Sequence, residues 1–152
     1  MAVVLVQCSS FAQLNLRYND LGAEGAGNLA EMLGRCSSLT QLDLHFNRIG
    51  DKGARSLARV LGQCCLLDEL DLGCNGIGDE GARSLAGALG RCSSLKRLFL
   101  GENLIDDDGV AMLRESWLGD SGLFVAHQVS QKTTRSPFRR TAYRGMRWVW
   151  NG

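Results

Sequence analysis

Four side chains near the middle of the sequence are of types that can transfer protons. Three are the carboxylates Asp43, Glu69 and Asp71, and the fourth is the imidazole of His45. General acid–base catalysis also needs a pocket that shifts pKa values and excludes water. Each of these residues lies in a short segment with strand periodicity, so we expect them on an open sheet face. The sequence therefore predicts no catalytic residues and a protein that is not an enzyme.

The acidic run from Asp106 to Asp108 is of a type that binds cations. It lacks the regularly spaced oxygen ligands of a dedicated calcium loop. In the repeat alignment this run overlays Gly78, Asp79 and Glu80, which are expected to form a loop and the start of a helix. Acidic side chains at a helix N-terminus interact favourably with the helix dipole. We therefore predict no metal site and no cofactor.

The cysteines suggest packing instead of chemistry. No C-x-x-C pair occurs, which argues against zinc or a redox motif. Unpaired cysteine packs as a small hydrophobe, and many free thiols suit a reducing compartment. With no membrane span in the sequence, we predict a cytoplasmic protein. The cysteines that recur at one spacing, and so mark one buried position per repeat, are Cys8, Cys36, Cys64 and Cys92.

That spacing belongs to a repeat of 28 residues, of which LTQLDLHFNRIGDKGARSLARVLGQC is the clearest copy. In its first half apolar and polar residues alternate, which predicts a short strand with Leu42 and Leu44 on one face. Its second half carries apolar residues at helical spacing from Ala54 to Leu61, and Gly62 then ends the helix. Asp51 is expected as an acid at the helix N-terminus. Such a unit cannot bury its apolar face alone, so the repeats must stack.

An asparagine follows each strand, at positions 19, 47, 75 and 103. Its amide can donate and accept hydrogen bonds with the turning backbone. Stacked at the repeat spacing, these side chains are predicted to form a structural ladder that satisfies buried backbone groups.

The organisation that follows has four repeats between two irregular ends. Residues 1–8 align with residues 57–64, so the chain opens in the second half of a repeat helix, as expected of a piece of a longer array. An apolar flank of the first strand should then be exposed. The predicted segments are 1–10 (end of a truncated repeat), 11–38, 39–66, 67–94, 95–118 (a degenerate fourth repeat) and 119–152 (a basic, disordered tail).

The last segment carries the basic residues Lys132, Arg135, Arg139, Arg140, Arg144 and Arg147 and no acid after Asp120. Either it caps the last repeat or it is an unrelated extension; residues 123–126 are apolar enough for one more edge strand. We expect residues 131–150 to be largely disordered. Their basic and aromatic residues leave open the binding of nucleic acid or an anionic membrane through residues 132–150.

The pattern L-x-x-L-x-L-x-x-N-x-I-G-D-x-G-A-x-x-L-A-x-x-L resembles the ribonuclease-inhibitor-like class of leucine-rich repeats over residues 1 to about 117. The resemblance implies an α/β fold: a right-handed βα solenoid with a parallel sheet on the concave face and helices on the convex face. The repeats also look like those of NOD-like receptors and of the Ran GTPase activator, which bind proteins. The P-loop of NOD-like receptors is absent, and the tail is basic where the Ran activator's is acidic.

We therefore predict a non-catalytic module that binds a protein partner on its concave face, with no small-molecule substrate. A regulatory or scaffold fragment of a NOD-like receptor or GTPase-activator type protein is the alternative. An acidic middle from Asp43, Glu69 and Asp71 would steer a basic partner. The predicted concave-face site residues are Arg17, Tyr18, Gln41, Asp43, His45, Phe46, Glu69, Asp71, Arg97, Phe99 and Glu102.

Overall fold

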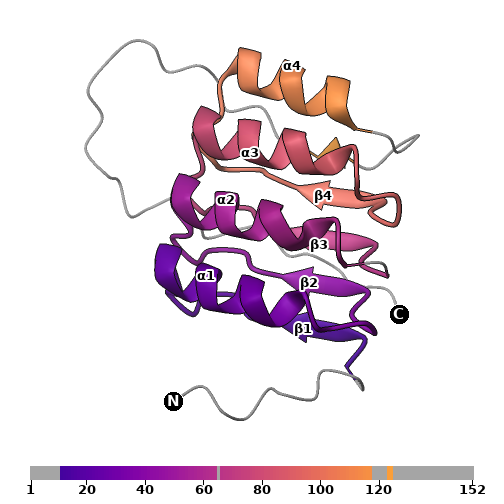
Figure 1. Ribbon diagram of the computed structural model, residues 1–152. Coiled ribbons are helices and arrows are strands. Elements are labelled where there is room, and N and C mark those ends of the chain that lie inside the picture. Colours follow the sequence, from indigo (N-terminus) through magenta and orange to yellow (C-terminus); the bar gives the residue numbers. More distant parts are fainter. Residues whose placement is uncertain (1–10, 65, 118–122, 125–152) are drawn as a thin grey trace, which may run out of the picture.

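The computed structural model describes residues 11–64, 66–117 and 123–124. Strands and helices alternate along the chain, and the helices stack in one layer beside the layer of strands (Figure 1). This confirms the predicted α/β repeat architecture. The elements are β1 (Gln13–Asn15), α1 (Gly22–Leu33), β2 (Gln41–Asp43), α2 (Gly50–Leu61), β3 (Glu69–Asp71), α3 (Asp79–Leu89), β4 (Arg97–Phe99), α4 (Asp107–Ser116) and β5 (Leu123–Phe124).

The strands form one parallel sheet in the order β1-β2-β3-β4-β5. Equivalent residues of successive repeats pair, as in Leu42 with Leu70 and Leu70 with Leu98. Because the connections return by a helix each time, the strands run parallel and the helices cover one face of the sheet. Strand β5 pairs with β4 through Leu98 and Leu123, which confirms the edge strand expected near residue 123.

The core lies between the sheet and the helices. Leu42, Leu70 and Leu98 are 1%, 0% and 0% exposed, so the inward face of each interior strand is the one that the alternation predicted. The helices contribute the predicted stripe, with Ala54 and Leu57 fully buried. Small residues permit the close stacking: a Cβ placed on Gly53 would lie 3.0 Å from the Cβ of Ala26 in the preceding helix.

The asparagine ladder forms as predicted. The Oδ1 atom of Asn75 accepts hydrogen bonds from the backbone N–H groups of Asn47 (2.8 Å) and Ile49 (3.3 Å) in the preceding repeat. Its Nδ2 donates to the carbonyls of Leu44 and Gly73. Asn47, Asn75 and Asn103 therefore each satisfy backbone groups of their own and of the preceding repeat, which would otherwise be buried unpaired.

Asp51 occupies the first turn of α2, as expected, but its carboxylate serves the next helix. Its Oδ1 accepts hydrogen bonds from the N–H groups of Gly78 (2.7 Å) and Gly81 (2.9 Å) at the start of α3. Asp79 likewise accepts from the N–H of Asp106 before α4. The acid therefore caps the neighbouring helix, an arrangement that a local interpretation of the sequence missed.

The repeated cysteine position is buried, as predicted, in the three copies that the structure describes: Cys36, Cys64 and Cys92. Burial raises the pKa of the Cys92 thiol, since the thiolate would lose its hydration; nearby Arg91 opposes this. The thiol of Cys64 donates to the carbonyl of Val60 at 3.5 Å. The position thus packs as part of the core in these three repeats.

Several predictions concern residues outside the described part of the chain. These are the position of Cys8, the disorder of residues 131–150 and the binding of nucleic acid or membranes through residues 132–150. Within the described ranges, no helix is long and apolar enough to cross a membrane.

Candidate functional site

The predicted site residues lie on the face of the sheet away from the helices, or at the carboxyl ends of its strands. Strands β2 and β3 have the same exposure pattern, with a buried leucine between two half-buried polar residues. Gln41 and Asp43 flank the leucine of β2, and Glu69 and Asp71 flank that of β3. The sheet thus presents a grid of polar side chains whose spacing is fixed by the strand register.

The acids at the strand ends hold the backbone as it leaves the sheet. Asp43 Oδ1 accepts from the N–H of His45 at 3.0 Å, and Asp71 Oδ1 accepts from the N–H of Gly73 at 2.8 Å. Asn15 forms the same bond two residues ahead in the first repeat. These are side-chain turns of the kind that Asp and Asn favour. Part of the predicted acidic middle is therefore structural.

The same acids also face bases on neighbouring strands. The Nη1 of Arg17 lies 3.2 Å from the Oδ2 of Asp43. The Nη2 of Arg97 lies 2.8 Å from the Oε2 of Glu69, and the Nδ1 of His45 lies 3.6 Å from the Oδ1 of Asp71. Partial burial disfavours the charge on Arg17, but the nearby carboxylates, Asp43 foremost, outweigh it and raise the pKa of its guanidinium. The open face thus carries ordered, paired charges.

A cluster of rings gathers at the ends of β1 and β2, and we call its residues, Arg17, Tyr18, His45 and Phe46, the aromatic corner. The rings of Tyr18 and Phe46 are 5.1 Å apart between centroids, and Tyr18 lies 6.0 Å from His45 at a steep angle. The guanidinium of Arg17 lies 5.6 Å from the centre of the Tyr18 ring. Aromatic and cation–π contacts of this geometry are attractive, so the cluster is internally ordered.

The two exposed rings of the corner are held in an unusual backbone conformation. Tyr18 and Phe46 both have φ of 57°, in the left-handed region that bulky residues rarely adopt. Cys74 and Glu102, at the equivalent positions of the next repeats, have φ of 54° and 57°. The turn thus imposes this conformation in every described repeat. Tyr18 nonetheless is 63% exposed and Phe46 44%, so two large rings stand outward where glycine would be less strained.

Glycine at position 73 makes room for the imidazole of the corner. A Cβ at Gly73 would lie 2.7 Å from the Nδ1 of His45, closer than real Cβ contacts occur. Because the third repeat has glycine at this position, the imidazole of His45 can lie next to the backbone of Gly73 and beside Asp71.

The remaining predicted residues do not join the corner. Arg97 and Phe99 lie on β4, separated from β1 by two strands, and Glu102 follows β4. Among residues 11–64, 66–117 and 123–124, no three His, Cys, Asp or Glu side chains group in a way that could hold a metal ion. The structure thus places the aromatic corner on the first two repeats, whereas Arg97 on the fourth repeat pairs with Glu69 on the third.

These features define the class of protein: a leucine-rich repeat solenoid with an open, side-chain-lined face. A family model described as Leucine Rich repeat matches residues 7–30, 35–58 and 63–86. Among solved structures 55 chains match, and one is titled "Leiomodin-1 Actin-Binding Site 2 (ABS2)". That structure shares 18% sequence identity, with a TM-score of 0.69 over 79% of this chain and 73% of the other. No curated protein matches the chain. The chain is built from leucine-rich repeats, and the similarity to the leiomodin structure is one of fold.

Proposed function

We propose that this protein is a non-catalytic interaction module that binds a protein partner at the aromatic corner and the adjoining open face of the sheet. The observation that carries the proposal is the outward exposure of Tyr18 and Phe46 at positions where the backbone would favour glycine. Exposed aromatic side chains beside arginine are the residues that dominate protein interfaces.

The corner also suits binding because its side chains are ordered before a partner arrives. Tyr18 packs on Phe46 and against Arg17, and Arg17 is fixed by Asp43. A partner that covers these rings therefore orders few further side chains, which lowers the entropic cost of association. Because the nearby charges are paired within the fold, we expect a partner that inserts an apolar side chain against the rings.

Replacing Phe46 with glycine tests this function without adding backbone strain. Phe46→Gly removes the ring and relieves the left-handed conformation, so the free energy of unfolding should change little while binding is lost. Leu66→Ala is the matched control, because Leu66 is 54% exposed but lies before β3, at the opposite end of the strands. Tagged wild-type protein and both variants would be compared by quantitative mass spectrometry of the proteins they retain from cells.

We expect at least one protein to be retained by the wild type and by Leu66→Ala and lost from Phe46→Gly. Its purified form should then bind the wild type at least about tenfold more tightly than Phe46→Gly, the effect of removing an interface anchor. If every retained protein binds the two variants equally, the corner is not the site.

The finer assignments are also proposals. We propose that the repeats are of the ribonuclease-inhibitor-like class, supported by the 28-residue register and by a helix of 10 to 12 residues in each described repeat. Monomeric actin is a defined probe to include in the binding assay, because the leiomodin structure is titled an actin-binding site. Binding of actin that Phe46→Gly abolishes would make actin the partner.

A further inference from the structure

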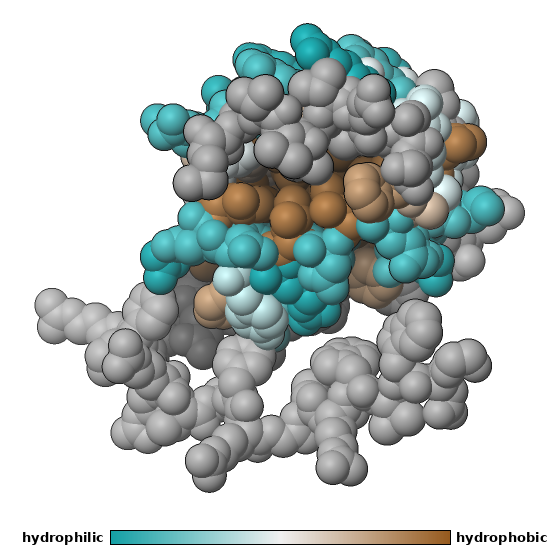
Figure 2. Space-filling model, turned by 90° about the horizontal axis from the view of Figure 1, so that it is seen from below, coloured by the Kyte–Doolittle hydropathy of each residue, from teal (hydrophilic) through white to brown (hydrophobic). Residues whose placement is uncertain are grey.

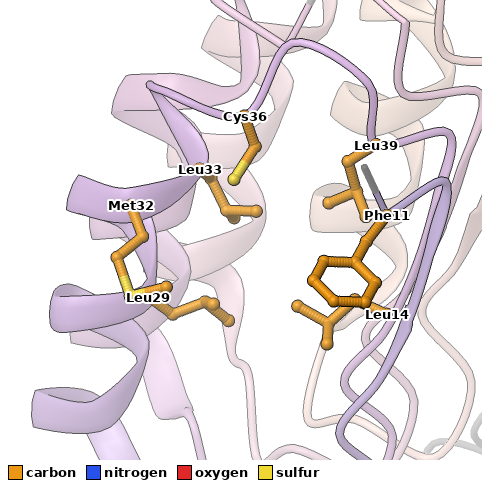
Figure 3. Close-up of a pocket in the computed structure, with 7 residues that line it drawn as sticks. All are labelled: Phe11, Leu14, Leu29, Met32, Leu33, Cys36 and Leu39. Carbon is orange, nitrogen blue, oxygen red and sulfur yellow. The ribbon is translucent and has the colours of Figure 1, made fainter. Parts of the chain in front are cut away.

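An apolar hollow lies at the end of the solenoid formed by the first repeat. Figure 3 shows side chains of α1 and the turn after it on one side, facing side chains around β1 on the other. Viewed from that end, apolar residues form a band bordered by hydrophilic ones (Figure 2). The lining residues are Phe11, Leu14, Leu29, Met32, Leu33, Cys36 and Leu39.

Equivalent positions in the interior repeats are covered. Phe11 is 56% exposed, whereas Leu39, Leu67 and Leu95, at the same place in later repeats, are 4%, 2% and 5% exposed. In the interior, the cover comes from the helix of the preceding repeat and the return loop after it. Helix α2, for example, packs on α3, and its residues Ala58 and Leu61 are buried.

The ten residues before Phe11 align in sequence with the second half of such a helix and its return loop. In repeat register Ala2, Leu5 and Cys8 take the positions that Ala58, Leu61 and Cys64 hold in the second full repeat. The family match supports the register, because its segments begin at residues 7, 35 and 63. The segment thus has apolar side chains at the positions that are buried in the later repeats.

The position of the hollow fits the length of this segment. A segment equivalent to residues 57–64 packs against the second half of the following helix and the turn after it, since the helices run side by side in register. The hollow lies along that half of α1, from Leu29 to Cys36. The first half of α1 is instead rich in small residues, Gly22 to Gly27, which present little apolar side chain to cover.

We propose that residues 1–8 seat in this hollow and cover the first repeat, with Leu5 against the region of Leu33 and Cys36. The inference concerns a surface other than the aromatic corner and does not depend on the proposed function.

The register supplies a matched pair of variants for the test. Leu5→Asp places a carboxylate at a position equivalent to buried Leu61, whereas Val3→Asp places it at the position of exposed Arg59. The readout is the rate at which an alkylating reagent modifies Cys36 in the native full chain, measured by mass spectrometry. Cys92 is the internal control, because it is the equivalent cysteine of an interior repeat and, like Cys36, is 8% exposed.

We expect Leu5→Asp to speed the modification of Cys36 about tenfold or more, because losing the cover lowers the free energy of local opening. Val3→Asp should leave the rate unchanged, and Cys92 should keep its rate in both variants. Equal rates at Cys36 in the two variants would overturn the proposal. An equal rise at Cys36 and Cys92 would show that Leu5→Asp destabilises the whole chain, and the milder Leu5→Ala then decides. An equal rise at both cysteines in Leu5→Ala would overturn the proposal, whereas a rise at Cys36 alone would support it. A wild-type dimer by light scattering, with Cys36 protection that depends on protein concentration, would assign the hollow to a second copy instead.

Discussion

The first and third repeats follow one sequence pattern but differ in how deeply the same positions are buried. Phe11 and Leu14 lie exposed and half-buried in the first repeat, whereas their counterparts Leu67 and Leu70 are 2% and 0% exposed. The reason is that burial in a solenoid comes from both neighbours. A residue's contribution to stability is therefore decided by its place in the stack as much as by its own type.

The largest expected contrast is between Leu72 and its counterpart Leu16. Leu72 is 0% exposed between two repeats, so Leu72→Ala should lower the free energy of unfolding by about 2–5 kcal/mol. Leu16 is only partly buried, so Leu16→Ala should cost less, about 1 kcal/mol. Chemical denaturation of the two variants measures both values. Equal costs would mean that the place of Leu16 and Leu72 in the stack does not decide how much each contributes.

A second contrast concerns the asparagine ladder. Asn75→Ala leaves the N–H groups of Asn47 and Ile49 without their acceptor, so we expect a loss of about 2–3 kcal/mol. Asn19 is exposed, and its side chain donates to the carbonyl of Arg17, a bond that water can replace. Asn19→Ala should cost less than about 1 kcal/mol. Chemical denaturation of the two variants measures both losses. A larger loss for Asn19→Ala would refute the view that the ladder contributes most to stability where its side chains are buried.

The smallest contrast lies in the capping of helices between repeats. Asp51 caps α3 through two N–H groups, whereas the first repeat has Ala23 at this position and offers α2 no such cap. Asp51→Ala should destabilise the protein by about 1 kcal/mol, the usual value of an N-terminal cap. Asp51→Asn keeps the acceptor oxygen and should recover most of the loss. Hydrogen exchange at the start of α3 reports this locally, and exchange that stays unchanged in Asp51→Ala would contradict the capping role.

The aromatic corner shows how far the site could be predicted. Strand periodicity placed Tyr18 and Phe46 at strand ends, and composition marked them as binding residues. The sequence did not indicate that their backbone adopts a left-handed turn. The repeat register did place Arg97 and Phe99 on the fourth strand, and the strand order agrees. The acids were interpreted as an exposed patch, yet Asp43 and Asp71 each hold a turn and face a base. Such pairings depend on side-chain geometry across strands.

The sequence by itself determined the repeat, its strand and helix, the inward leucines and the asparagine ladder. These follow from periodicity, because side-chain direction alternates along a strand and recurs along a helix. Only the tertiary structure decided which helix Asp51 caps, which charges pair and where the stack lies open. Those features arise between repeats, where the identity of the neighbour, and not the local pattern, supplies the contact.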